Sequence, residues 1–211
     1  MERLICLAMG YIFGLFETGF IYGKLKGIDI RQHGSGNSGS TNTLRVLGKK
    51  AGIIVLIGDV LKCVIPCIIT RVIFKDLVDM TLLLVLYTGF GVVLGHNFPF
   101  YMNFKGGKGI ASTGGVIISV FDLRIFLICL AVFLLTVFIT RYVSLGSILG
   151  VTSFFITWTV LAVYGALPIG QMFVLESCIV VFAFACLGIF RHRSNIKRLL
   201  TGTENKFGAK K

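Results

Sequence analysis

Long apolar segments dominate this sequence, and they restrict the chain to a membrane. A helix needs about 20 mostly apolar residues to cross the hydrocarbon layer of a bilayer. Only 14% of the residues are charged, against roughly 25% in an ordinary soluble domain. We therefore predict an all-α integral membrane protein, a single polytopic domain over residues 1–211 with about seven transmembrane helices. The candidate spans lie near 4–22, 51–70, 80–98, 110–122, 125–140, 145–165 and 171–190.

The segment 110–122 is the weakest candidate. Its 13 residues are fewer than the roughly 17 that a full crossing requires. It either extends into the glycine-rich stretch before it or re-enters the membrane from one side, and the second case leaves six crossings. The basic residues favour seven, because with six crossings the basic stretch 191–211 would lie outside.

Basic residues gather on one side of the predicted membrane. With the N-terminus outside, 16 of the 21 lysines and arginines lie on the inner side, as expected for cytoplasmic loops. The first apolar segment is followed by Gly23-Lys24-Leu25-Lys26 and not by a small-residue cleavage site, so we expect it to remain as a span. We predict an outside N-terminus and a cytoplasmic C-terminus.

The six cysteines lie in apolar segments, without a C-x-x-C pair or a nearby histidine cluster. This pattern is typical of packed core residues and not of a disulfide framework or a metal site. We therefore predict no metal ion and no other cofactor.

The first of three polar segments on the predicted inner side covers residues 34–42 and continues to Arg45. Its glycines permit positive φ angles, so consecutive N–H groups can converge on an anion, and Arg45 adds a charge-assisted donor. A flexible loop is the simpler alternative. The match to G-x-G-x-x-G is not a dinucleotide site, because the segment lies between membrane spans and not in a β-α-β unit. The candidate phosphate ligands are Ser35, Gly36, Asn37, Gly39, Thr41, Asn42 and Arg45.

The second polar segment covers residues 95–109 and contains Lys105 and Lys108, spaced by glycines directly before a predicted helix. Flexible lysine side chains and the free N–H groups at the start of a helix together favour phosphate binding. Met102 and Gly109 stand where a Walker loop needs glycine and a hydroxyl residue. The alternative is a loop that binds lipid headgroups. For His96 a structural hydrogen bond is as good an explanation as a catalytic role.

The third polar segment covers residues 191–204, after the last span. If the helix continues there, His192, Asn195 and Leu199 share one face, and Arg193 and Lys197 share another. We expect the first face to meet a functional site and the second to meet lipid headgroups.

Charged residues also occur inside the predicted spans, where they are costly. Asp59 and Lys62 stand at positions i and i+3 of one helix, so each can neutralise the other. Glu17 has no partner that the sequence identifies, so it either faces a polar cavity or is protonated.

Together the three segments resemble the bacterial acyl-phosphate:glycerol-3-phosphate acyltransferase family. The family patterns G-S-G-N-x-G-x-T-N-x-x-R-x-x-G, G-H-x-x-P with F-K-G-G-K-G, and H-R-x-N-I-x-R-L-x-x-G match residues 34–48, 95–109 and 192–202. The resemblance extends to Asp59-x-x-Lys62 and to the segment 141–148. Glu17 and Thr18 depart from it, because they replace a more usual small-Pro-type turn in the first span. Ser38 and Ser40 stand where the family often has an apolar or small residue, and Cys63 stands where it often has glycine.

The resemblance implies transfer of a fatty acyl group from acyl phosphate to glycerol 3-phosphate, giving lysophosphatidic acid and phosphate, the first acylation step of phospholipid synthesis. It also implies seven spans in the bacterial cell membrane, an active site at the cytoplasmic face, and no direct need for acyl carrier protein or coenzyme A. The expected partners are therefore the two substrates and membrane lipids, and no nucleic acid.

The expected catalytic residues are Ser35, Arg45, Lys108, His192 and Asn195. Lys108, His192 and Asn195 are assigned to glycerol 3-phosphate. Lys105 and Ser147 are further phosphate candidates. Acyl phosphate is already activated, so orientation and charge stabilisation suffice and no covalent acyl-enzyme is needed. Whether His192 is a general base or only binds substrate stays open.

A membrane transporter or channel for an organic phosphate is the main alternative function. It predicts polar motifs on both membrane faces or repeated halves, whereas here the motifs lie on one predicted face. The acyltransferase class that uses H-x-x-x-x-D is excluded, because Ser38, Tyr101 and Lys197 occupy the fifth position after the three histidines. A metal-dependent phosphatidyltransferase is excluded too, because it would need an acidic cluster on the inner side, whereas Asp76-x-x-Asp79 lies on the predicted outer side.

Overall fold

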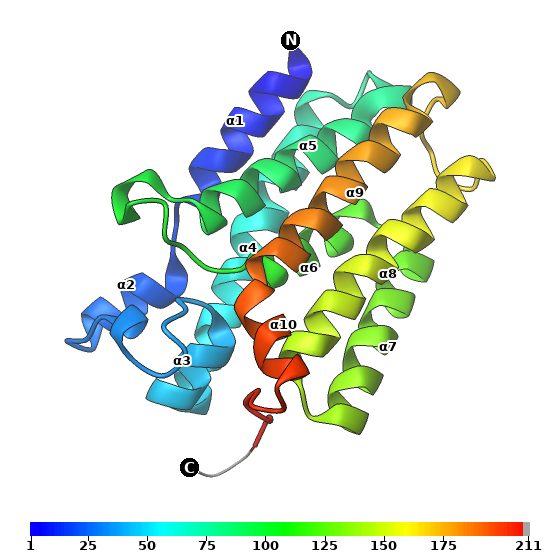
Figure 1. Ribbon diagram of the computed structural model, residues 1–211. Coiled ribbons are helices and arrows are strands. Elements are labelled where there is room, and N and C mark those ends of the chain that lie inside the picture. Colours follow the sequence, from blue (N-terminus) through cyan, green and yellow to red (C-terminus); the bar gives the residue numbers. More distant parts are fainter. Residues whose placement is uncertain (209–211) are drawn as a thin grey trace. The chain divides into compact units, whose positions relative to one another are not determined.

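A computed structural model describes residues 1–208, and these residues form helices and connecting segments without a strand (Figure 1). Lys210 and Lys211, which the charge argument placed on the inner side, lie outside the described residues. The elements in chain order are α1 (Glu2–Gly14), α2 (Thr18–Leu25), η1 (Ile30–Gln32), α3 (Ser40–Leu47), α4 (Lys49–Ile73), α5 (Val78–Asn97), η2 (Phe100–Met102), α6 (Ile110–Val120), α7 (Leu123–Thr140), α8 (Val143–Val163), η3 (Gln171–Phe173), α9 (Val174–Arg191) and α10 (Arg193–Leu200).

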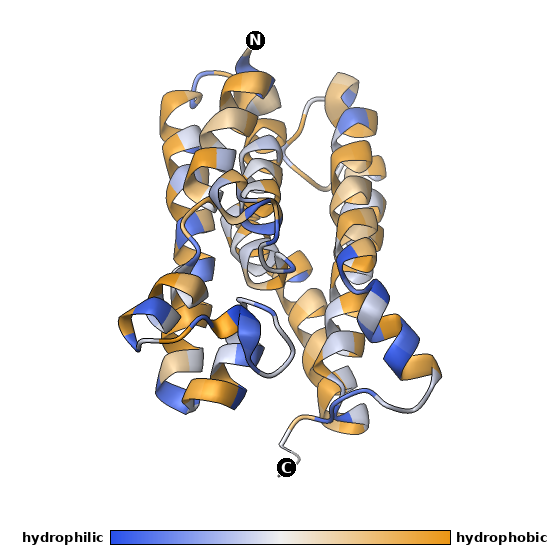
Figure 2. Cartoon of the chain, turned by 60° about the vertical axis from the view of Figure 1, so that its left-hand side comes forward, coloured by the Kyte–Doolittle hydropathy of each residue, from blue (hydrophilic) through white to orange (hydrophobic). Residues whose placement is uncertain are grey.

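Six segments of the described chain are long and apolar enough to cross a membrane. They are Glu2–Leu25, Lys49–Ile73, Val78–Met102, Leu123–Thr140, Val143–Val163 and Gln171–Arg191. Figure 2 shows hydrophobic residues over these helices, and hydrophilic residues concentrated in the connecting segments and short helices. Large apolar side chains such as Leu135 and Phe138 of α7 are exposed, as expected for a surface in contact with lipid.

The fourth predicted span is a short helix. α6 has 11 residues, about 16 Å at 1.5 Å per residue, roughly half of the 30 Å hydrocarbon core. It begins at Ile110 and does not extend into the glycine-rich stretch before it. The all-helical membrane fold is therefore confirmed, whereas the count of seven crossings stays a prediction.

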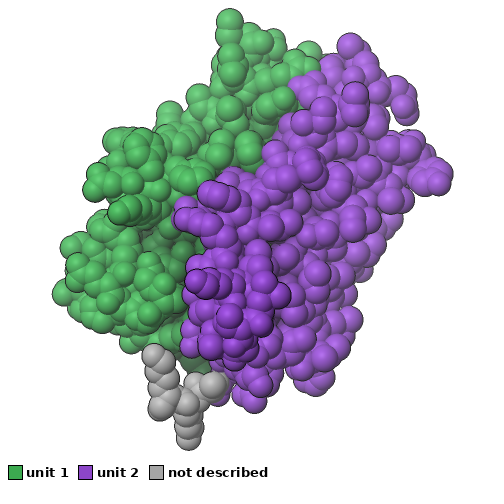
Figure 3. All heavy atoms as spheres, in the orientation of Figure 1, with its two compact units in different colours: residues 1–120 green, residues 121–211 purple. Residues whose placement is uncertain are grey.

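The chain divides into two compact units, residues 1–120 and 121–211 (Figure 3). In the first unit α1 packs along α5 through glycines. A Cβ at Gly10 or Gly14 would overlap backbone atoms of α5, and a Cβ at Gly91 or Gly95 would overlap those of α1. Small residues let membrane helices approach this closely. The prediction of a single domain over the whole chain is not tested by this division.

The first span is broken in the middle, which the sequence did not predict. α1 ends at Gly14 and α2 begins at Thr18. The break leaves carbonyl groups without helical partners, and two of them accept hydrogen bonds from side chains. The Tyr101 hydroxyl donates to the Leu15 oxygen at 2.6 Å, and Lys62 Nζ donates to the Phe16 oxygen at 2.9 Å. Broken helices occur at membrane depth where protein groups satisfy the backbone in this way.

In the second unit α8 packs against both α7 and α9. Phe154, Trp158 and Phe184 are buried between α8 and α9 in edge-to-face contacts. Trp158 Nε1 donates to the Ser177 hydroxyl at 3.0 Å, which satisfies the indole in an apolar core. These contacts therefore hold α8 and α9 against each other.

Candidate functional site

The loop 34–42 is organised by the side chain of Asn42. This buried amide donates to the carbonyl oxygens of Ile30, His33 and Asn37 at 2.9–3.2 Å, and its Oδ1 accepts from the Ser35 N–H at 2.8 Å. All of its polar atoms are thus used within the chain. These bonds hold the loop in shape, and a direct role of Asn42 in phosphate binding stays a prediction.

Backbone groups of the same loop are also occupied. The Gly36 N–H donates to the His33 oxygen, and the Gly39 N–H donates to Asn37 Oδ1. The N–H groups of Ser35, Gly36 and Gly39 therefore bond within the chain in this structure, and their convergence on an anion stays a prediction. Side-chain donors on this segment are the hydroxyls of Ser35 and Thr41, the amide of Asn37 and the exposed guanidinium of Arg45.

The segment that precedes the loop 34–42 contains an ion pair outside the membrane spans. Arg31 forms two hydrogen bonds to the Asp29 carboxylate, at 3.0 Å and 2.8 Å. The Arg31 guanidinium lowers the pKa of Asp29 to about 2, because it stabilises the charged carboxylate. Asp29 also caps η1 through the Arg31 N–H.

The second glycine-rich loop is attached to the C-terminal end of α5 by backbone hydrogen bonds. The Gly107 N–H donates to the His96 oxygen at 3.0 Å, and the Gly106 N–H donates to the Asn97 oxygen at 3.2 Å. Lys105 is exposed in this loop, and Lys108 is half-buried directly before α6. The loop therefore brings a lysine to the start of a helix, as the sequence predicted.

Two buried polar side chains beside this loop were missed by the sequence reasoning. Both amide atoms of Asn97 and the hydroxyl of Ser112 are buried, without a hydrogen-bond partner among the described residues. Asn97 Oδ1 lies against Gly109, 2.9 Å from the position that a Cβ would take. Buried polar groups are costly without hydrogen bonds, so these atoms mark a place for a water molecule or a polar ligand group.

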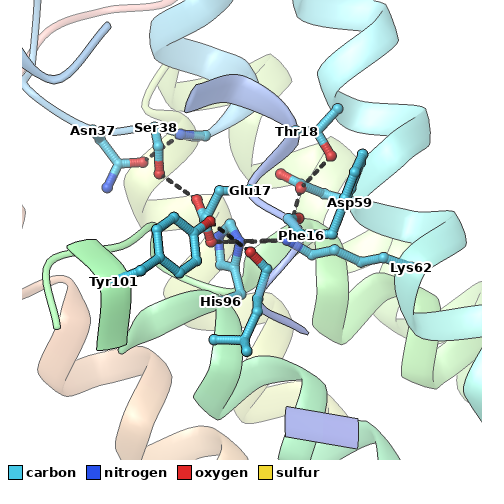
Figure 4. A network of polar contacts seen from close by, with 11 residues as sticks. Phe16, Glu17, Thr18, Asn37, Ser38, Asp59, Lys62, His96 and Tyr101 are labelled. Carbon is cyan, nitrogen blue, oxygen red and sulfur yellow. Dashed lines mark hydrogen bonds and ion pairs between the residues drawn. The ribbon is translucent and has the colours of Figure 1, made fainter. Parts of the chain in front are cut away.

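A buried charged cluster lies at the break between α1 and α2 (Figure 4). Lys62 Nζ is 2.9 Å from Asp59 Oδ1, which confirms the predicted pair within α4. His96 Nδ1 is 2.7 Å from both Lys62 Nζ and Glu17 Oε1. Glu17 therefore has partners that the sequence did not reveal, and its Oε2 accepts a hydrogen bond from the Ser38 hydroxyl at 2.8 Å. The contact at Oε1 is an ion pair by distance, without hydrogen-bond geometry.

In the second unit the predicted residues occupy the end of α9 and the start of α10. The helix does not run on as expected, because α9 ends at Arg191 and α10 begins at Arg193. The two faces are nevertheless as predicted: His192 and Asn195 are buried, whereas Arg193 and Lys197 are exposed.

Glu204 joins Ser144, Asn195 and Arg198 into a hydrogen-bonded group and was missed by the sequence reasoning. Its buried carboxylate accepts from Asn195 Nδ2 at 2.7 Å, from the Ser144 hydroxyl at 3.1 Å and from Arg198 Nε at 2.7 Å. A signal was present, because Glu204 is the single acidic residue in the basic stretch 191–211. A lone carboxylate among cations is a candidate for a buried pairing partner.

His192 and Ser147 are each held by a backbone carbonyl. His192 Nδ1 lies 2.8 Å from the Gly188 oxygen. This contact favours the proton on Nδ1, and Nε2 is then the acceptor nitrogen of a neutral ring. The Ser147 hydroxyl donates to the Val143 oxygen at 2.8 Å within α8 and is buried.

The family model described as glycerol-3-phosphate acyltransferase matches residues 4–202, nearly the whole chain. The chain belongs to the glycerol-3-phosphate acyltransferase family. The curated glycerol-3-phosphate acyltransferase of Clostridioides difficile is 43% identical to it, over 99% of this chain and 97% of the relative. The enzyme of the same name from Bacillus subtilis is 40% identical, over 96% of each chain.

Solved structures of the same family agree with this fold. Crystal structures of PlsY (YgiH), an integral membrane glycerol 3-phosphate acyltransferase, are 38% identical to this chain. The glycerol 3-phosphate form has a TM-score of 0.83, and the lysophosphatidic acid form has 0.82. Both comparisons cover 99% of this chain and 96% of the other. The predicted family and the integral membrane class are thereby confirmed.

Membership of the glycerol-3-phosphate acyltransferase family also decides between the classes of function considered above. An acyltransferase is an enzyme, so the transporter alternative loses its support. Among the predicted site residues, the first unit contains Ser35, Arg45, Lys105 and Lys108. Ser147, His192 and Asn195 belong to the second unit, and their roles in binding stay predictions.

Proposed function

We propose that this family member transfers a fatty acyl group from acyl phosphate to glycerol 3-phosphate, giving lysophosphatidic acid (1-acyl-glycerol 3-phosphate) and phosphate. One observation carries the proposal: the first unit places a cation beside each of its two glycine-rich loops, Arg45 in α3 after the loop 34–42 and Lys108 directly before α6. Two anionic substrates need two such groups, because a buried phosphate requires charge-assisted donors.

The donor and the acceptor are supported by different observations. Glycerol 3-phosphate and lysophosphatidic acid are named with the solved relatives, which are 38% identical to this chain. The acyl phosphate donor is supported by the three motifs of the sequence. We assign Lys108, His192 and Asn195 to glycerol 3-phosphate. The residues assigned to phosphate groups are Ser35, Gly36, Asn37, Gly39, Thr41, Asn42, Arg45, Lys105, Lys108 and Ser147.

The reaction requires little covalent chemistry from the protein. The acceptor hydroxyl oxygen attacks the acyl carbonyl carbon, the bond from that carbon to the phosphate oxygen breaks, and phosphate leaves with the electron pair. The hydroxyl proton passes to the departing phosphate or to His192 Nε2. Cations such as Lys108 stabilise the developing negative charge. His192 chiefly positions the acceptor in this scheme.

Initial rates with both substrates test this function. Purified protein is incubated with palmitoyl phosphate and labelled glycerol 3-phosphate, and labelled lysophosphatidic acid is measured. Direct transfer gives intersecting lines when both concentrations are varied, and His192→Ala raises KM for glycerol 3-phosphate more than it lowers kcat. Parallel lines or a trapped acyl-protein ester would refute direct transfer. Product formed from acyl coenzyme A alone would refute the proposed donor.

We also propose that the protein lies in the bacterial cell membrane with an outside N-terminus and its active site at the cytoplasmic face. The support is the excess of basic residues in 23–50, 99–109 and 191–211. In a cysteine-free background, an impermeant maleimide applied to intact cells is expected to label Asp76→Cys and not Ser40→Cys or Asn205→Cys. Labelling of Ser40→Cys or Asn205→Cys before lysis would contradict this topology.

A further inference from the structure

The charged cluster at the α1–α2 break connects to both glycine-rich loops of the first unit. Glu17, Asp59, Lys62 and His96 are each 5% exposed or less. They come from the break itself, from α4 and from the last turn of α5. Their contacts are therefore tertiary, except for the Asp59 and Lys62 pair within α4.

One connection runs from Glu17 to the loop 34–42. The Ser38 hydroxyl, 1% exposed, donates to Glu17 Oε2 at 2.8 Å. Ser38 stands between Asn37, whose carbonyl and side chain shape this loop, and Gly39, the residue before α3. A shift of the Glu17 carboxylate therefore shifts the segment that leads into α3 and Arg45.

The other connection runs from His96 to the loop 105–109. The imidazole lies so close to Gly107 that a Cβ there would overlap Nε2, and the His96 carbonyl accepts the Gly107 N–H at 3.0 Å. Lys108 is the next residue. Because Nδ1 of the same ring meets Glu17 and Lys62, one imidazole joins the cluster to the lysine loop.

Burial restricts the movement of the side chains in this charged cluster. Ionised groups removed from water are stable only when charge and hydrogen bonds are balanced. The cluster combines two carboxylates, of Glu17 and Asp59, with the Lys62 ammonium and the His96 imidazole. Movement of one member would take a partner away from another buried charge, which is costly in the protein interior, so the cluster favours one geometry.

We infer that Glu17, through Ser38 and His96, is a positioning residue that holds the two cationic loops in the arrangement that binds phosphate-bearing substrates. The inference rests on the proposed function. Glu17 acts through other residues and is not itself a ligand.

The test compares the affinity for glycerol 3-phosphate among full-length variants in detergent, measured by titration calorimetry, with Tm measured in parallel. Glu17→Ala and Ser38→Ala are each expected to weaken binding about tenfold, the equivalent of one hydrogen bond to a charged group. The double variant should be no weaker than the worse single variant, because both changes break the same link. Glu17→Gln retains an acceptor for Ser38 and should lose less.

Thr70→Val is the matched control. Its hydroxyl is buried between α4 and α5, the helices that supply the cluster, and lies 2.6 Å from the Thr88 hydroxyl. The Thr70→Val substitution should lower Tm and leave the affinity for glycerol 3-phosphate within twofold of wild type. If Glu17→Ala does not fold, Ser38→Ala, which removes one oxygen atom, still decides the matter.

Wild-type affinity in both Glu17→Gln and Ser38→Ala would overturn the inference, because the cluster would then serve stability alone. Failure of the proposed function gives a different result. Wild-type protein that binds glycerol 3-phosphate but forms no product from acyl phosphate would refute the donor, and the variants would still report on positioning. Wild-type protein that binds neither glycerol 3-phosphate nor inorganic phosphate would overturn both.

Discussion

Lys108→Ala and Arg45→Ala are each expected to lower kcat/KM by about 10- to 150-fold. The physical reason is the loss of a charge-assisted hydrogen bond to phosphate, worth roughly 1.5–3 kcal/mol, at about 1.4 kcal/mol per factor of ten. Lys108 is half-buried and Arg45 is exposed. The larger effect is therefore expected at Lys108, because water screens charges less where they are shielded from it.

Lys49→Ala provides the matched control for these variants. Lys49 is an exposed lysine at the start of α4, outside both glycine-rich loops. Its removal changes the net charge by the same amount and should leave kcat/KM within about twofold, as expected for a screened surface charge. Initial rates at varied glycerol 3-phosphate and acyl phosphate measure all three variants. Near-normal rates for Lys108→Ala and Arg45→Ala would favour lipid headgroup anchoring as the role of these loops.

Gly106→Ala is expected to lower activity by about 100-fold, the upper end of what a misplaced catalytic loop costs. A Cβ at this position would overlap the His96 carbonyl oxygen, which belongs to the backbone of α5, and would lie 2.6 Å from Pro99 Cδ. The loop can accept a methyl group only by moving away from α5, which breaks the hydrogen bond from the Gly106 N–H to the Asn97 oxygen. Lys108 then leaves its place before α6.

Gly114→Ala is the control for this loop variant. Gly114 lies in α6, and no atom would lie within 4 Å of an added Cβ. Alanine favours a helix over glycine by about 1 kcal/mol, so this variant should keep full activity and an equal or higher Tm. Rates and Tm of both variants, measured on the same preparation, separate loss of the loop from loss of the fold. Full activity of Gly106→Ala would show that the loop geometry does not matter for the reaction.

Local patterns predicted the parts of this protein that depend on neighbours in sequence. The apolar runs indicated six spans that the structure contains, because burial in lipid depends on composition over a window of about 20 residues. The pairing of Asp59 with Lys62 followed from helical spacing alone. The buried and exposed faces around Asn195 and Lys197 followed from the same periodicity, although α9 and α10 are separate helices.

Other features depend on residues that are far apart in the chain. Hydropathy does not show the break between α1 and α2, because its stability comes from Tyr101 and Lys62, which accommodate the freed carbonyls. The role of Asn42 in shaping the loop was not predicted, because an amide that shapes a loop and an amide that binds phosphate look the same in sequence. Glu204 was missed since its partners Ser144 and Asn195 come from different helices.

The sequence by itself determined the membrane fold, the family and the cationic loops, because composition, periodicity and long motifs are properties of consecutive residues. Only the tertiary structure decided which polar groups are consumed internally and which remain for a substrate. It paired Glu17 with Ser38 and His96, and it left the side chain of Asn97 without a hydrogen-bond partner among the described residues. Partners of buried polar groups are chosen by three-dimensional packing, since any satisfied donor and acceptor pair removes the cost of desolvation regardless of separation along the chain.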